Sequence, residues 1–365
     1  NMKSFVTLLL LALAIATVLA SSTSERESFV KCILKECKAE DSLKTCSKQC
    51  LKRNTTAYAT CTKLCKGENC ESKCKRLVKL LEQKKKQQSR QITSNEVMSE
   101  GAKDTIRIGS FNIQVFGAKK MENRAVVDVL LKVLARYDIV LVQEIRDSSD
   151  SAIHALLAEL KAKTGKQLSL SISGRLGRTN SKEQYGYIYD SSKIRVVKDY
   201  QYEDAKDNFE RAPYSVLIEV IASKKKMMLS GVHISPSKAV AEIDHLYDVY
   251  KFYEAKSDLK DIMKNNWIVM GDMNADCGYL SKSKWNQIRL RTDQSFNWLI
   301  KDGTDTTVAT SVCAYDRFVT THKVTPQWLK GVNVFNFGTE FKLDPAFVKK
   351  VSDHYPIELV IDTSA

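Results

Sequence analysis

The stretch IVMGDMNAD, residues 268–276, runs from an apolar segment directly into a group of polar side chains. Its first residues are typical of a strand buried in a sheet, and Asp272 and Asn274 follow at the strand's end. A carboxylate at such a position is costly unless it meets cations or hydrogen-bond donors. The stretch therefore predicts a core strand whose end carries a functional group.

Hydrophobic periodicity places this strand in an α/β fold. Residues 105–113 alternate as a strand, 126–134 follow helical spacing, and 138–145 form a second buried strand. The remaining elements predicted from periodicity are a helix with its apolar face at 153–160, a long helix at 238–264, and strands at 168–173, 185–190, 214–220, 226–234, 267–273, 314–320 and 354–362. Several strands are too close together for crossover connections, so we expect largely antiparallel sheets flanked by helices.

Polar residues recur at the ends of these predicted strands, as they do in IVMGDMNAD. The residues that share this position are Asn112, Glu144, Glu183, His233, Asp272, Asn274, Asp316, Asp353 and His354. Each is unremarkable alone, but together they predict one site rich in oxygen ligands with two imidazoles nearby. Such a donor set suits Mg²⁺ better than zinc.

Length and charge bound the possible partners. The chain has 365 residues, 43% of them hydrophobic, which is enough for one large domain and a smaller one. The net charge of +14 favours polyanions such as nucleic acid or an anionic membrane surface. Residues 1–20 have the basic start, apolar run and small-residue end of a signal peptide, so we expect a secreted, extracellular protein.

Eight of the ten cysteines lie between Cys32 and Cys74, many of them four residues apart. In a secreted chain this spacing predicts a basic, disulfide-stapled α-helical module over residues 21–80, whose connectivity stays open; a metal cluster is the alternative. Asn54 begins a glycosylation sequon in this module. Residues 81–103 are polar and indicate a linker, whose basic residues also permit proteolytic processing.

From residue 104 the chain resembles deoxyribonuclease I, a branch of the endonuclease, exonuclease and phosphatase superfamily. The resemblance extends to about residue 363, in stretches such as FNIQVFG, RYDIVLVQEIRDS, HISPSKAVAEIDHLYDVY, GDMNADCGY, CAYDR and SDHYP. It implies that residues 104–365 form a catalytic domain with a four-layer α/β/β/α sandwich. It also implies a DNA endonuclease that uses Mg²⁺ or Mn²⁺, is assisted by structural Ca²⁺, and leaves 5′ phosphates.

The resemblance also assigns roles to residues of this chain. His233 oriented by Glu183 and His354 oriented by Asp316 would be the catalytic pairs, with the general acid and general base not distinguished. The other implied groups are a divalent-ion and phosphate shell of Glu144, Asp272, Asn274, Asp353 and Asn112, DNA contacts from Arg146, Arg178 and Arg211, calcium sites at Asp305 and Thr307 and at Asp204, Asp207 and Phe209, and a disulfide between Cys277 and Cys313.

The chain departs from the family at several positions. Ser181 stands where the family inserts a tyrosine into the minor groove, and Gln114 and Gln184 stand where arginine is usual, so we expect a weaker grip on duplex DNA. Ala212 and Ala309 replace residues that assist the calcium sites. Binding to actin is left undetermined, and the protein is expected to be a monomer.

Two other functions are compatible with these patterns. One is a catalytically weak or inert scaffold that carries a toxin-like or antimicrobial binding module. The other is a different phosphodiesterase of the same superfamily. The module's partner could be a polyanion, a membrane surface or none.

Overall fold

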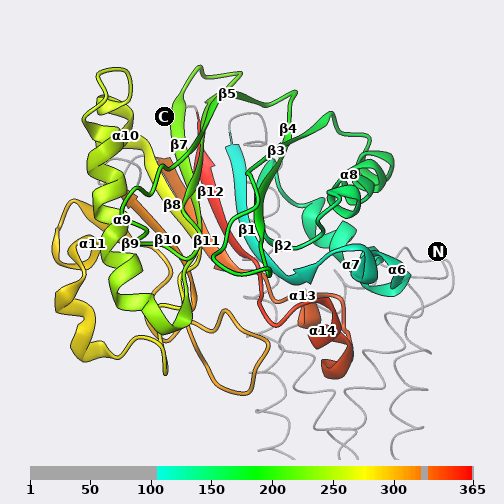
Figure 1. The fold of residues 1–365 in the computed structure, drawn as a ribbon. Coiled ribbons are helices and arrows are strands. Elements are labelled where there is room, and N and C mark those ends of the chain that lie inside the picture. The colour runs from blue at the N-terminus through cyan, green and yellow to red at the C-terminus, as the bar shows by residue number, and fades with distance from the viewer. Residues whose placement is uncertain (1–104, 322–327, 364–365) are drawn as a thin grey trace, which may run out of the picture. The chain divides into compact units, whose positions relative to one another are not determined.

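The computed structural model describes residues 105–321 and 328–363 (Figure 1). The predicted signal peptide (1–20), cysteine-rich module (21–80), linker (81–103) and glycosylation site at Asn54 lie outside the described residues. Within the described part of the chain, no helix is both long enough and apolar enough for a membrane span.

In the described residues, twelve strands form two sheets of six. The first sheet has the spatial order β11 (Leu329–Val334), β12 (Ile357–Asp362), β1 (Thr105–Phe116), β2 (Ile139–Ile145), β4 (Gln184–Asp190) and β3 (Leu168–Ile172). The second has the order β5 (Ile194–Gln201), β6 (Tyr214–Val220), β7 (Lys226–His233), β8 (Trp267–Asp272), β10 (Asp316–Thr321) and β9 (Phe296–Trp298).

Helices cover the outer face of each sheet (Figure 1). Those on the first sheet are α6 (Ala118–Glu122), α7 (Arg124–Leu134), α8 (Ser151–Thr164), α13 (Phe337–Glu340) and α14 (Pro345–Val351). Those on the second are η1 (Pro236–Lys238), α9 (Ala239–Glu254), α10 (Lys260–Asn266), η2 (Lys282–Gln287) and α11 (Arg289–Thr292).

Three hydrophobic cores hold these layers together. The central core lies between the two sheets and includes Ile108 and Leu141 from the first and Leu229 and Met270 from the second. A core on each outer side joins a sheet to its helices. β8 has a core on each face, with Val269 in the outer core and Ile268 and Met270 in the central one, which is why these residues show no polar alternation. The four-layer α/β/β/α sandwich is confirmed.

The sheets are largely antiparallel, as predicted, but each contains one parallel pair. β1 pairs with β2 and β7 pairs with β8, and helices make the crossover in both cases. Parallel strands end at the same edge of a sheet, so polar residues that follow them gather there. Asn112 is in register with Gln143 in the first pair, and His233 with Asp272 in the second.

Gly271 allows β8 to approach β7 just before Asp272. Its φ is +141°, and a Cβ at this position would lie 2.0 Å from the carbonyl oxygen of Val232. Any side chain would push the strands apart, so glycine is required in IVMGDMNAD.

Some predicted boundaries were wrong. The helix expected at 238–264 is broken, because the chain turns between α9 and α10 and buries Leu259 completely. The strand expected from 354 begins at Ile357, since Pro356 has no N–H to donate. The strands β5, β9 and β11 were missed. All three lie at sheet edges. β5 and β11 are largely exposed or half-buried, which weakens their periodicity, and β9 has only three residues, too few to show one.

The structure contains a disulfide between Cys277 and Cys313, with the Cα atoms 5.8 Å apart. The two cysteines are 36 positions apart in the sequence, so the disulfide closes a long loop. By chain-entropy reasoning such a link contributes about 3 to 4 kcal/mol. It secures the segment between β8 and β10, both of which begin or end at a predicted site residue.

Candidate active site

Two histidines each contact a buried carboxylate. His233 Nδ1 lies 2.7 Å from Glu183 Oε2, and His354 Nδ1 lies 2.7 Å from Asp316 Oδ2. All four side chains are buried. A carboxylate on Nδ1 orients the ring and leaves Nε2 available for proton transfer.

Both imidazoles converge on Asp272. The Nε2 atoms of His233 and His354 lie 3.6 Å and 3.4 Å from Asp272 Oδ2. Asn112 Nδ2 donates to the same oxygen at 3.3 Å and to Glu144 Oε1 at 3.0 Å. The ends of β1, β2, β7 and β8, from both sheets, therefore meet in one cluster.

Hydrogen bonds between side chains and backbone groups hold the part of this cluster that comes from the first sheet. Ser352 Oγ donates to the carbonyl of Asn112 at 2.7 Å and accepts from His354 N at 3.0 Å. Val115 N donates to Glu144 Oε2 at 2.8 Å. Gln114, Val115 and Glu144 all have positive φ, between 47° and 58°. Such strained backbone persists only where its surroundings over-determine it, and it is commonly found at functional sites.

The other two predicted shell residues border the same cluster. The amide of Asn274 donates from Nδ2 to the carbonyl of Ile234 at 2.9 Å, and its N–H donates to Asp272 Oδ1 at 3.0 Å. Asp353 is 52% exposed, with Oδ1 3.9 Å from His354 Nε2. Asn274 therefore supports Asp272, whereas Asp353 lies at the solvent side of the site.

The donor set fits a hard divalent cation. Ligand atoms of Asp272, Asp316 and His354 lie within 4.8 Å of one another. Asp316 Oδ1 is buried and has no hydrogen-bond partner among the described residues, although a buried carboxylate oxygen normally requires one. Asn112 also donates a hydrogen bond to Glu144, which brings a further carboxylate to this cluster. The cluster is therefore rich in carboxylate oxygens, the ligands that Mg²⁺ and Mn²⁺ prefer.

Charged neighbours shift the pKa values of His354 and Glu183. Desolvation is the largest effect on His354 and lowers its pKa, but Asp316, Asp272 and Asp353 together outweigh it and raise the pKa from 6.5 to about 10. Desolvation is also the largest effect on Glu183 and raises its pKa, yet His233, Arg211 and Arg146 outweigh it and lower the pKa to about 2. Glu183 is therefore ionised at neutral pH.

We expect Asp316→Asn to lower the pKa of His354, because Asp316 is the largest of the effects that raise it while the burial that lowers it remains. Since the folded pKa lies above 6.5, protonation of His354 stabilises the wild type fully below pH 6.5, and this contribution is lost as pH rises through about 10. An NMR titration of the metal-free protein measures the change. The exposed His154 is the internal control, and an unshifted His354 would contradict the prediction.

The three arginines predicted to contact DNA all meet acidic partners or backbone in this structure. Arg146 lies 2.8 Å from Glu183 and 3.3 Å from Glu144. Arg178 pairs with Asp207 at 3.0 Å, and Arg211 Nε donates to the carbonyl of His233 at 3.1 Å. Arg146 and Arg178 retain partial exposure, whereas the side chain of Arg211 is only 11% exposed. Their contact with DNA stays a prediction.

The two predicted calcium sites lie in separate loops. Asp305 Oδ1 accepts from the N–H and the hydroxyl of Thr307, at 3.1 Å and 3.2 Å. In the other loop, Asp204 Oδ2 accepts from Phe209 N at 2.7 Å. Each of these hydrogen bonds joins residues of the same loop. Calcium binding by the two loops stays a prediction.

Two tyrosines beside the site were not predicted to have a role there. The ring centroid of Tyr315 lies 6.4 Å from that of His354, and Tyr279 lies 5.2 Å from Tyr315. Tyr279 is 45% exposed. Tyr315 directly precedes Asp316 in CAYDR, which is the one signal that could have identified it.

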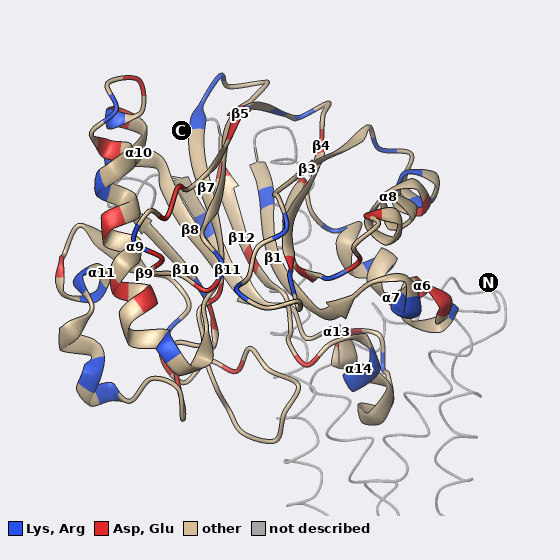
Figure 2. Cartoon of the chain, viewed as in Figure 1, with Lys and Arg blue, Asp and Glu red and all other residues tan. Residues whose placement is uncertain are grey.

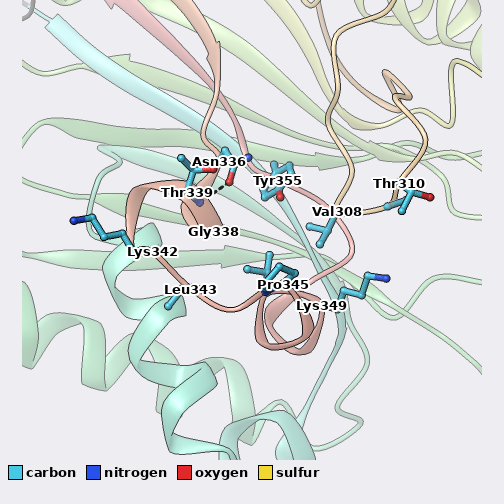
Figure 3. Close-up of a pocket in the computed structure, with 12 residues that line it drawn as sticks. Val308, Thr310, Asn336, Gly338, Thr339, Lys342, Leu343, Pro345, Lys349 and Tyr355 are labelled. Carbon is cyan, nitrogen blue, oxygen red and sulfur yellow. Dashed lines mark hydrogen bonds between the residues drawn. The ribbon is translucent and has the colours of Figure 1, made fainter. Parts of the chain in front are cut away.

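A separate pocket of about 480 Å³ lies next to the catalytic segment (Figure 3). Val308, Leu343, Pro345 and Tyr355 supply apolar lining, and Lys342 and Lys349 add positive charge. Tyr355 follows His354, and Val308 N donates to the carbonyl of Asp353 at 2.8 Å. The pocket is lined by none of the predicted catalytic or metal-binding residues.

Comparisons with known proteins agree with this geometry. Residues 109–354 match the model of the Endonuclease/Exonuclease/phosphatase family. Deoxyribonuclease-1-like 2 of Mus musculus is 40% identical over 261 residues, covering 71% of this chain and 92% of that protein. Deoxyribonuclease-1 of Ovis aries is 38% identical over 264 residues, covering 70% and 100%.

A solved structure of an endonuclease/exonuclease/phosphatase family protein from Leptotrichia buccalis shares the fold, with a TM-score of 0.51 and 16% identity over 70% of this chain and 99% of that one. At this identity it bears on the fold alone. The family match and the curated relatives carry the assignment: the chain belongs to the endonuclease/exonuclease/phosphatase family and, within it, to the deoxyribonuclease I family.

Proposed function

We propose that this chain is a secreted endonuclease that hydrolyses DNA phosphodiester bonds to 5′-phosphate products with Mg²⁺ or Mn²⁺. The observation that supports it most is the convergence of two imidazoles, each paired with its own buried acid, on Asp272. The named relatives, deoxyribonuclease-1 and its homologue, support DNA as the substrate.

The two histidines have complementary tasks in such a reaction. One imidazole accepts a proton at Nε2 from the attacking water, and the other donates a proton from Nε2 to the leaving 3′ oxygen. Glu183 and Asp316 keep both rings oriented and stabilise their charged forms. General acid and base catalysis of this kind contributes roughly 10²- to 10⁴-fold each.

The residues proposed to hold the cation are Glu144, Asp272, Asn112, Asn274 and Asp353. When bound, the cation would neutralise the charge that develops on the phosphoryl oxygens. Asn112 bridges Glu144 and Asp272 through Nδ2, so it keeps the two carboxylates together in spite of their mutual repulsion. We also propose calcium sites at Asp305 and Thr307 and at Asp204, Asp207 and Phe209.

Affinity for DNA would come mainly from backbone phosphates. The net charge of +14 supports this, as do Lys349 and Lys350 in the last turn of α14, which is blue in Figure 2. We propose Arg146, Arg178 and Arg211 as contacts, which requires that DNA compete with their acidic partners. The basic module at 21–80 is proposed as an accessory that associates with a polyanion or membrane surface.

Nicking of supercoiled plasmid tests the proposed activity. We expect nicking with Mg²⁺ or Mn²⁺ present, loss of nicking when EDTA removes the cation, and 5′-phosphate ends that a ligase can rejoin. Failure of the purified wild-type protein to nick DNA with either cation would support an inert scaffold or a different phosphodiester substrate.

A further inference from the structure

Lys120, on α6, donates to three main-chain carbonyls from two distant segments. Its Nζ lies 2.5 Å from the carbonyl oxygen of Ile113, 2.6 Å from that of Gln114 and 2.9 Å from that of Val351. An ammonium group has three N–H donors, so all three are in use. This leaves none for a phosphate of bound DNA.

The two segments joined in this way carry separate parts of the active site. Ile113 and Gln114 directly follow Asn112, at the end of β1 where the backbone turns to positive φ. Val351 ends α14 and precedes Asp353 and His354 by two and three residues. Lys120 therefore spans the same gap as the bond from Ser352 Oγ to the carbonyl of Asn112.

The environment of Lys120 is that of a structural cation. Burial is the largest effect on its pKa and lowers it to about 8, while the charges of Asp353 and Glu144 act in the opposite direction. A solvated lysine at the rim of a DNA site would avoid this desolvation. Its neighbour Lys119 is exposed and shows what a solvated lysine of α6 looks like.

We infer that Lys120 is a positioning residue, which holds the end of β1 against residues 351–354 and so sets the placement of Asn112 and Glu144 relative to Asp353 and His354. The effect on catalysis rests on the proposed nuclease function, but the positioning of the two segments by Lys120 does not. Lys120 also orders the strained backbone at Gln114 and Val115. Two of the three carbonyls that it binds, those of Ile113 and Gln114, lie at the start of this strained segment.

The test compares Lys120→Met with Lys119→Met, which removes a neighbouring charge from the same helix. For Lys120→Met we expect kcat for plasmid nicking to fall about 10- to 100-fold, the range seen when residues supporting metal ligands are lost. KM should change less than about threefold, and the Kd for Mn²⁺, measured by electron paramagnetic resonance, should rise. Lys119→Met should keep the wild-type kcat.

Hydrogen exchange of the uncleaved, DNA-free protein gives a readout that is independent of nuclease activity. In Lys120→Met, amides within 113–116 and 351–354 should exchange faster than in the wild type, with those of α9 unchanged. If Lys120→Met does not fold, Lys120→Gln, which keeps a polar donor, carries the same comparison.

Unchanged exchange in both segments would overturn the inference, and so would a raised KM with an unchanged kcat, the pattern of a phosphate contact. If the wild-type protein does not nick DNA, the proposed function fails. Hydrogen exchange and Mn²⁺ binding still decide whether Lys120 positions the two segments.

Discussion

Replacing either imidazole is expected to reduce plasmid nicking by roughly 10²- to 10⁴-fold, because each supplies one of the two proton transfers that the reaction needs. The variants are His233→Ala and His354→Ala, and the measurement is the initial rate of nicking at saturating Mg²⁺. The double variant should lose less than the product of the two single effects, since residues that act as a unit are not additive.

The matched control for these variants is His154→Ala, an exposed histidine of α8 that should retain the wild-type rate. His354→Ala leaves Asp316 buried without its partner, and breaking a buried pair in this way can cost about 3 to 5 kcal/mol. His354→Gln keeps a donor within reach of Asp316 and separates loss of catalysis from loss of folding. A rate within a few-fold of wild type for folded His233→Ala or His354→Gln would contradict the assignment.

Asp272→Asn is expected to lower nicking by roughly 10²-fold or more and to raise the Mg²⁺ concentration needed for half-maximal activity. Asp272 Oδ2 is the atom on which both imidazoles and Asn112 converge, so neutralising it removes the charge at the centre of the site. A loss of about 2.7 kcal/mol in transition-state stabilisation corresponds to this factor. Asparagine keeps the volume and an acceptor for Asn274 N–H, so the strand end should stay folded.

A divalent-ion titration of nicking, with Mn²⁺ binding measured separately, checks this prediction. Asp276→Asn is the control from the same GDMNAD segment, because Asp276 bonds to the backbone of Cys277 and Ala314 instead of to the imidazoles. If Asp272→Asn kept both the wild-type rate and the wild-type ion requirement, the metal and phosphate shell proposed here would be wrong.

The strand ends that carry the site could be recognised from local sequence, whereas the bonds between them could not. Asp272, His233 and Asn112 each follow an apolar run, and burial makes such a polar residue conspicuous. The sequence could not show that Asn112 bonds to both Glu144 and Asp272, since the bond to Asp272 crosses from the first sheet to the second. The pairing of His233 with Glu183 and of His354 with Asp316 came from the family resemblance, and the structure shows both contacts.

The predicted DNA contacts show a limit of sequence reasoning about charge. Arg146, Arg178 and Arg211 are all basic and all lie in loops or strand ends, as a phosphate-binding residue would. In the structure, Arg146 and Arg178 pair with acids, and Arg211 mainly supports the backbone of His233. A sequence shows that a charge exists, but only the folded chain shows which opposite charge it meets.

The sequence by itself determined most of the strands and helices, the residue types at the strand ends and the family, because hydrophobic periodicity and the order of motifs can be read along the chain. It did not show the edge strands β5, β9 and β11. Tertiary structure alone decided that both imidazoles share Asp272 and that Lys120 joins β1 to the segment before His354. The physical reason is distance along the chain. Asp272 is distant in sequence from both imidazoles, and Lys120 lies 231 positions from Val351. The acceptors of Lys120 are main-chain carbonyls, which every residue possesses and no sequence pattern marks.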